Sequence, residues 1–168
     1  MRNLKRSLLT AAGATLLAVV AMPVMAHAQY PSQRGQPRTP FGATDFARLH
    51  WLEGDWAGTA PDESPLFVRC KFTSDSTAEI TYYRDAAFAQ ASGSSRLYLS
   101  VGRVYHSFGP NRWGASHIGA DGVVFVPQVS TRSNLQWDYV SADEWKATQR
   151  SGVGGHEHVT VYDLKRVR

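Results

Sequence analysis

The chain of 168 residues contains a single cysteine, Cys70. One cysteine cannot form a disulfide within its own chain, so the fold has to be held by core packing rather than by covalent cross-links. We interpret Cys70 as a small buried hydrophobic residue, with an intermolecular disulfide as the alternative.

Long apolar runs are confined to the N-terminus. Three basic residues within the first six positions precede an apolar run over residues 8–24, and Ala26-His27-Ala28 then places small residues at both recognition positions of a cleavage site. This pattern predicts a secretory signal peptide over residues 1–28, with a retained N-terminal anchor as the alternative. We therefore expect an exported protein, periplasmic or secreted, with no membrane span after removal of the signal.

A clear excess of charge is also missing. The chain has 18 Lys and Arg residues against 14 Asp and Glu residues, but three of the 18 lie in the predicted signal, which leaves 15 against 14. Because no basic patch or RNA-type aromatic motif is present either, we expect no nucleic-acid partner. The composition does not indicate an oligomeric state.

Motifs for nucleophilic or phosphate chemistry are weak. The segment 114–119 contains Ser116 but is one residue too long for a Gly-x-Ser-x-Gly elbow. The glycines of residues 152–155 precede a predicted strand rather than a helix, which argues against a phosphate loop. We assign no catalytic residue and do not favour an enzyme.

The chain is rich in residues that alternate between apolar and polar. Residues 66–72, 135–139 and 145–149 have a clear period of two. Short strands of this kind, about 8–10 in number, with no long helix, predict an all-β fold, either an antiparallel barrel or a sandwich. We expect residues 96–108 to form one bent strand with a bulge at Gly102, and residues 85–91 a short helix.

Two N-terminal segments differ from this pattern. Residues 29–44 are rich in proline and glycine and predict a flexible arm. In residues 45–52, Phe46, Leu49 and Leu52 follow Asp45 at helical spacing, which predicts a short helical turn that Gly54 ends. Residues 45–168 then form one domain.

A short helical plug, then Gly54-Asp55-Trp56, then a succession of strands resembles the calycin superfamily, which includes lipocalins, fatty-acid-binding proteins and nitrobindin-like barrels. The resemblance implies a lipocalin-like, up-and-down barrel over residues 45–168. It also implies that Trp56 lies across the closed end under a basic residue of the last strand. Of the basic residues near the C-terminus we choose Arg166, so that Gly54, Trp56 and Arg166 close the barrel.

A barrel of this size either packs solid or holds one small ligand. We predict an apolar pocket that binds a small, mostly apolar molecule; the alternative is a solid-core interaction module in the cell envelope. The pocket candidates are aromatic residues of the predicted strands: Tyr82, Tyr98, Tyr105, Trp113, Phe125, Trp137, Tyr139 and Trp145.

Two histidines, His156 and His158, project from one face of the last predicted strand. That strand resembles the last strand of nitrobindins, in which a histidine ligates haem, and the resemblance implies His156 or His158 as the haem ligand. Residues 58–65 depart from the glycine-rich stretch found there in nitrobindins. We favour a solvated strand start as the role of the histidine pair; haem is an alternative, and a non-haem metal is a further one, for which His106 and His117 are the only candidates for third ligands.

Overall fold

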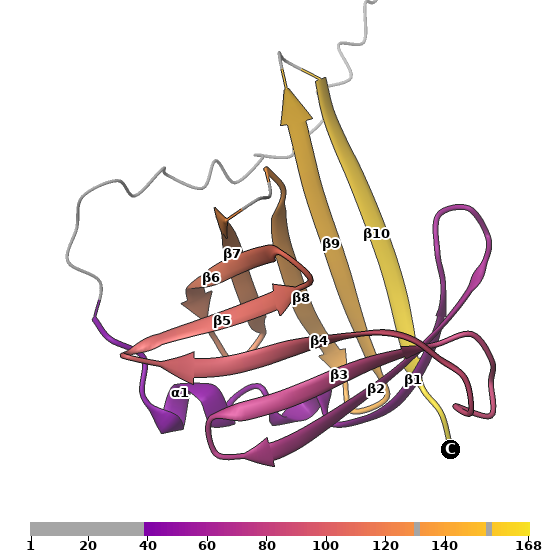
Figure 1. Cartoon of the computed structure of the whole chain (residues 1–168), viewed down its shortest axis with the longest axis horizontal. Coiled ribbons are helices and arrows are strands. Elements are labelled where there is room, and N and C mark those ends of the chain that lie inside the picture. The colour runs from indigo at the N-terminus through magenta and orange to yellow at the C-terminus, as the bar shows by residue number, and fades with distance from the viewer. Residues whose placement is uncertain (1–38, 130–131, 154–155) are drawn as a thin grey trace, which may run out of the picture. The chain divides into compact units, whose positions relative to one another are not determined.

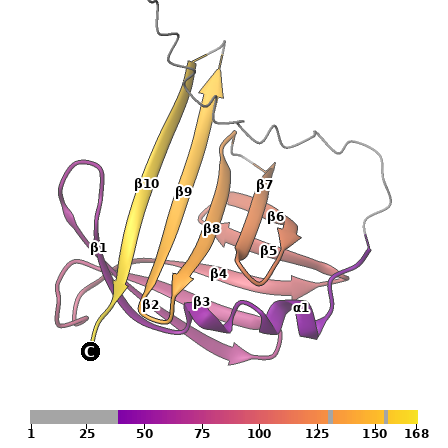
Figure 2. The same ribbon diagram turned by 180° about the vertical axis from the view of Figure 1, so that it is seen from behind.

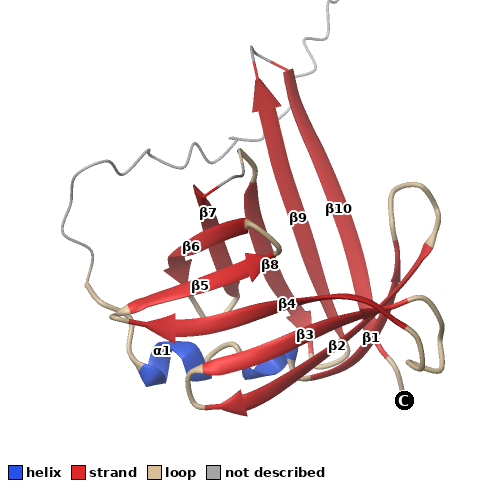
Figure 3. Cartoon of the chain, in the orientation of Figure 1, coloured by secondary structure: helices blue, strands red, loops and turns tan. Residues whose placement is uncertain are grey.

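The computed structural model describes residues 39–129, 132–153 and 156–168 (Figure 1). The predicted signal peptide and residues 29–38 of the predicted arm lie outside the described residues. Within the described residues the chain forms ten strands, preceded by the α-helix α1 (Ala43–Ala47) and the 3-10 helix η1 (His50–Leu52) (Figure 3). The strands are β1 (Gly54–Thr59), β2 (Pro65–Ser74), β3 (Thr77–Tyr83), β4 (Ala91–Ser100), β5 (Arg103–Phe108), β6 (Asn111–Ile118), β7 (Gly122–Val129), β8 (Asn134–Ser141), β9 (Glu144–Val153) and β10 (His156–Arg166).

The strands form a closed barrel in which each strand pairs antiparallel with its neighbours in the sequence. Closure comes from β1, which pairs with β2 on one side and with β10 on the other. The closing register places Trp56 opposite Arg166 and Thr59 opposite Asp163. The predicted all-β, antiparallel up-and-down barrel with a short N-terminal helical segment is therefore confirmed.

The helical segment lies across one end of the barrel (Figures 1 and 2). Its apolar residues Phe46, Leu49 and Leu52 are at most 1% exposed, so they pack as a plug against the barrel interior. The helix begins earlier than predicted, at Ala43, because the Asp45 carboxylate accepts the backbone N–H of Gly42 from the N3 position, at 3.0 Å. Among the described residues, no helix has the length and apolar character needed to cross a membrane.

The segment 96–108 is not the single bulged strand expected from the sequence. β4 and β5 are separate strands, joined by a tight turn in which Val101 has φ 48° and Gly102 has φ 70°. Two successive residues in the left-handed region give the turn geometry that joins twisted antiparallel strands. The turn also holds the N-terminal segment, because the Phe41 N–H donates to the Gly102 carbonyl at 2.9 Å. Phe41 lies in the predicted arm but is thus bonded to the barrel.

The short helix expected over residues 85–91 is also absent, and β4 begins at Ala91. Asp85 is the physical reason. Its carboxylate accepts the backbone N–H groups of Ala87, Ala89 and Gln90 at 3.0, 3.2 and 2.8 Å, which fixes a loop. Asp bonds of this kind compete with helical bonds and favour turns.

The single cysteine is part of the core. Cys70 lies on β2, is 4% exposed and forms no disulfide. Burial raises the pKa of its thiol to about 12, so the thiol stays protonated at neutral pH. The interpretation of Cys70 as a buried small hydrophobic residue is confirmed.

Candidate functional site

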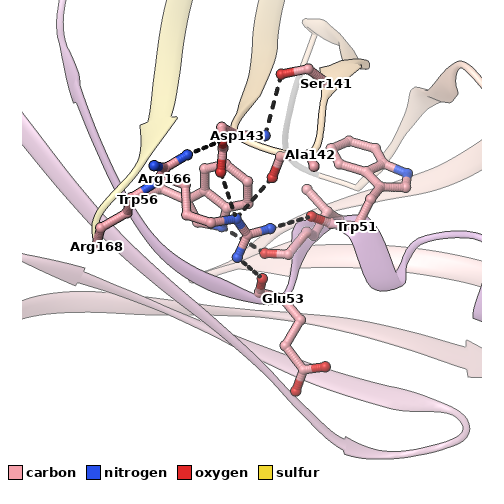
Figure 4. A network of polar contacts seen from close by, with 9 residues as sticks. Trp51, Glu53, Trp56, Ser141, Ala142, Asp143, Arg166 and Arg168 are labelled. Atoms are coloured by element: carbon pink, nitrogen blue, oxygen red, sulfur yellow. Dashed lines mark hydrogen bonds and ion pairs between the residues drawn. The ribbon is translucent and has the colours of Figure 1, made fainter.

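The closed end of the barrel is organised around Trp56 and Arg166 (Figure 4). The Trp56 side chain is 1% exposed, and its indole N–H donates to the Leu52 carbonyl at 2.7 Å, which ties β1 to the plug. The guanidinium carbon of Arg166 lies 4.2 Å from the Trp56 ring centroid. A cation over an indole face is stabilising, and more so when it is desolvated.

The Arg166 guanidinium also donates hydrogen bonds to three backbone carbonyls in two separate segments. Nε donates to the Ala142 carbonyl at 2.8 Å, Nη1 to the Glu53 carbonyl at 2.8 Å and Nη2 to the Trp51 carbonyl at 3.5 Å. These carbonyls belong to the β8–β9 turn and to the plug. One side chain from β10 therefore joins the first and last elements of the barrel.

Gly54 is required beside this network. It has φ 127°, a backbone conformation that residues with a side chain rarely adopt. A Cβ at this position would also collide with the Arg166 guanidinium. The residue that ends the plug thus gives the arginine room to reach the backbone carbonyls.

An aromatic wall leads from the closed end into the barrel. The Trp56 and Trp145 rings are 6.2 Å apart, the Trp145 and Trp137 rings 5.8 Å, and the Trp137 and His106 rings 4.9 Å. All three contacts are edge-to-face, which is a favoured arrangement for aromatic rings. Strands β1, β9, β8 and β5 are thereby linked through their inward side chains.

The barrel interior contains a cavity of about 450 Å³. Its lining is mainly aromatic and aliphatic: Tyr82, Phe108, Trp113, Trp137, Trp145 and Tyr162 supply rings, and Leu52, Leu66, Val68, Ile80, Leu135 and Leu164 supply aliphatic groups. His106, Asn111, Thr148 and Gln149 supply polar groups. Among the described residues that line it, none is Asp, Glu, Lys or Arg.

Half of the predicted pocket residues line this cavity: Tyr82, Trp113, Trp137 and Trp145. Tyr98 and Tyr105 do not, contrary to the prediction, because they have the opposite strand phase to the buried Leu97 and Val104. They pair with each other across β4 and β5, with ring centroids 5.3 Å apart.

The other two predicted pocket residues also lie outside the lining. Phe125 is 0% exposed and packs within the core. Tyr139 has the inward phase of β8, but it lies near the plug, is 38% exposed and contacts Trp51. Strand phase alone therefore does not identify the cavity residues, because depth along the strand also matters.

His106 is the functional candidate that was not placed in the pocket from the sequence. It is 4% exposed and lies on β5, between Trp113 and Trp137, with ring distances of 5.4 and 4.9 Å. Within the described part of the chain, neither ring nitrogen has a hydrogen-bond partner. Burial lowers the pKa of His106 to about 4, so the ring is neutral at pH 7. The sequence did contain a signal for this position, because His106 is two residues after the apolar Val104 and so lies on the same face of the strand.

The indoles of the cavity differ in how their N–H groups are satisfied. The Trp113 N–H donates to the Ser133 carbonyl at 2.8 Å. The Trp145 N–H is buried and, among residues the structure describes, has no acceptor. Two residues of the cavity lining, Trp145 and His106, therefore carry buried polar atoms without a partner among the described residues, and both contact Trp137.

Of the two predicted haem ligands, the structure describes the side chain of His158 alone. The His158 side chain is exposed and does not line the cavity, and the side chain of His156 is outside the described residues. Across the described ranges, no group of three or more His, Cys, Asp or Glu side chains could hold a metal ion. The described geometry does not bring His158 to the cavity, and haem binding stays a prediction.

Comparisons with known proteins add little to this description. No protein-family model matches the chain, and no curated protein matches it. Among solved structures, a redesigned β-barrel is similar at 13% sequence identity with a TM-score of 0.33, and the match covers 70% of this chain and 93% of that one.

Proposed function

We propose that this chain is an exported, lipocalin-like barrel of the calycin type that binds one small, mostly apolar molecule inside the barrel. The observation that carries the proposal is the cavity of about 450 Å³. Ligand sites in proteins range over about 300–1,000 Å³ and are lined mainly by apolar and aromatic side chains with a few polar groups. The cavity has this size and this lining.

Two further features support the proposal. The contact of Arg166 with Trp56 has the arrangement that the calycin resemblance implies for the closed end. A solid-core interaction module, the alternative considered from the sequence, would fill its interior with side chains, and a cavity of this volume weighs against it.

The test is titration with N-phenyl-1-naphthylamine, a neutral apolar fluorophore that brightens on leaving water. Saturable binding to the wild-type chain is expected. Ala147 lines the cavity, so Ala147→Phe is expected to fill part of it and weaken binding about tenfold or more. The matched control is Val161→Phe, which adds a ring at a β10 side chain that is 44% exposed and is expected to leave binding unchanged.

Circular dichroism must show that both variants are folded before binding is compared. If Ala147→Phe does not fold, the smaller substitution Ala147→Val takes its place. Equal loss of binding in the Ala147 and Val161 variants, or no saturable binding to the wild type, would refute the proposal. If the wild-type chain binds the fluorophore saturably, native mass spectrometry of protein purified from its own host would identify the mass of the natural ligand.

A further inference from the structure

Three buried polar atoms of cavity-lining residues have no partner among the described residues: both ring nitrogens of His106 and the indole nitrogen of Trp145. Buried polar groups in native proteins are nearly always hydrogen-bonded, because an unmade bond costs the full desolvation of the group. Unpaired groups that line the same cavity therefore indicate hydrogen bonds that a ligand completes. His106 and Trp145 both contact Trp137, so they lie at neighbouring places on one wall.

The chemistry of these atoms restricts what they bind. A neutral imidazole has one N–H donor and one nitrogen acceptor, and an indole has a donor only. A hydroxyl group can both donate and accept, so it can give its proton to the free imidazole nitrogen and accept from an N–H group. A hydrocarbon could satisfy none of the three atoms.

The charge of the lining restricts the ligand further. No Lys or Arg is found among the described lining residues, so an anionic group would lose its hydration without gaining a cationic partner. His106 does not supply a positive charge at neutral pH, because burial keeps its ring neutral. The flat rings of Trp113 and Trp137 favour an aromatic body for the ligand.

We infer that the ligand is a neutral hydroxylated aromatic molecule whose hydroxyl group hydrogen-bonds His106, with the Trp145 indole N–H donating to an oxygen of the same molecule. The inference rests on the proposed function and specifies its ligand class. Carboxylates such as fatty acids are excluded by it.

The test uses three ligands that share one ring system: naphthalene, 2-naphthol and 2-naphthoate, titrated at neutral pH by calorimetry. The wild-type chain is expected to bind 2-naphthol about tenfold or more tightly than either of the others. In His106→Phe the preference for 2-naphthol over naphthalene should fall to less than about threefold, whereas affinity for naphthalene should persist. His106→Gln keeps a donor and an acceptor and is expected to retain much of the preference.

The matched control is His117→Phe, the same substitution at an exposed β6 residue outside the cavity lining, which should behave as the wild type. If His106→Phe does not fold, the wild type labelled with ¹⁵N at histidine answers the question: 2-naphthol must shift the His106 ring nitrogens, and naphthalene must leave them unchanged.

The outcomes separate the two proposals. Equal binding of naphthalene and 2-naphthol overturns the hydroxyl inference and leaves a general apolar pocket. Tightest binding of 2-naphthoate overturns the claim of a neutral ligand. If the chain binds neither N-phenyl-1-naphthylamine nor any of the three ligands, the proposed function itself is overturned.

Discussion

Arg166 and Trp56 are opposite each other where the last strand pairs with the first, and the guanidinium carbon lies 4.2 Å from the indole centroid. Both residues also bond to the plug, Trp56 through the Leu52 carbonyl and Arg166 through the Glu53 carbonyl. The contact therefore forms only when the barrel is closed and the plug is docked. Substitutions at either residue measure how strongly these two events are coupled.

Trp56→Ala should lower the free energy of unfolding by about 3–5 kcal/mol. The side chain is 1% exposed, so its removal leaves a void beside Trp145 and removes the bond to the Leu52 carbonyl. Urea unfolding followed by circular dichroism measures the change. A loss within experimental error of zero would show that Trp56 does not organise the closed end.

Arg166→Lys should cost about 1–2 kcal/mol, although it conserves the charge. A lysine has no planar fork, so it cannot donate to the Ala142 and Glu53 carbonyls while stacking on Trp56. The control is Lys165→Arg at the exposed neighbouring position, expected to change stability by less than about 0.5 kcal/mol. Equal effects at the two positions would contradict the role of the fork.

The barrel was predictable from the sequence because its signals are local. Period-two alternation and turn residues indicate strands whatever their partners are, and the Gly54-Asp55-Trp56 motif indicated closure. The β4–β5 turn was not predictable, because Val101 is a β-branched residue at positive φ, where turn chemistry normally places Gly or Asn.

The cavity was only half predictable, for a different reason. Strand phase separates inward from outward side chains and would have excluded Tyr98 and Tyr105. It does not say how far along the barrel a ring lies, so Phe125 in the core and Trp113 in the cavity are equivalent in sequence pattern. The unpaired state of His106 depends on its neighbours in three dimensions, which no local pattern encodes.

Gly54→Ala should destabilise the chain by about 1–3 kcal/mol. The new Cβ would be held at φ 127° and would collide with the Arg166 guanidinium. Gly93→Ala is the control, because a Cβ there makes only ordinary contacts with the Phe108 ring, at 3.8 Å or more. In an Arg166→Ala background the collision is gone, so Gly54→Ala should cost less than in the wild type. Equal costs in the two backgrounds would rule out the collision.

Val101→Asn should stabilise the chain by about 1 kcal/mol. Val101 is 98% exposed and has φ 48°, so it loses no packing on substitution, and Asn tolerates the left-handed region better. The same substitution at Val140, which is 47% exposed on β8 without positive φ, should destabilise through lower strand propensity. Thermal unfolding of both variants checks the opposite signs, and a shared sign would contradict the turn geometry.

Stability should fall with acidity through His106. The unfolded chain protonates this histidine near its ordinary pKa of 6.5, whereas burial lowers the pKa in the folded chain to about 4. Between these values the unfolded state binds the extra proton, so the free energy of unfolding decreases as pH falls, by up to about 1.4 kcal/mol per pH unit. Above the unfolded pKa the contribution is independent of pH.

Urea unfolding of the wild type and of His106→Phe at about pH 7 and about pH 5 measures this slope. The difference in stability between the two pH values should be larger in the wild type than in His106→Phe by about 2 kcal/mol. His117→Phe, an exposed position on β6, should keep the wild-type difference. If His106→Phe retained the full slope, the imidazole would have to be solvated in the folded barrel, and the neutral, unpaired His106 on which the ligand class depends would be wrong.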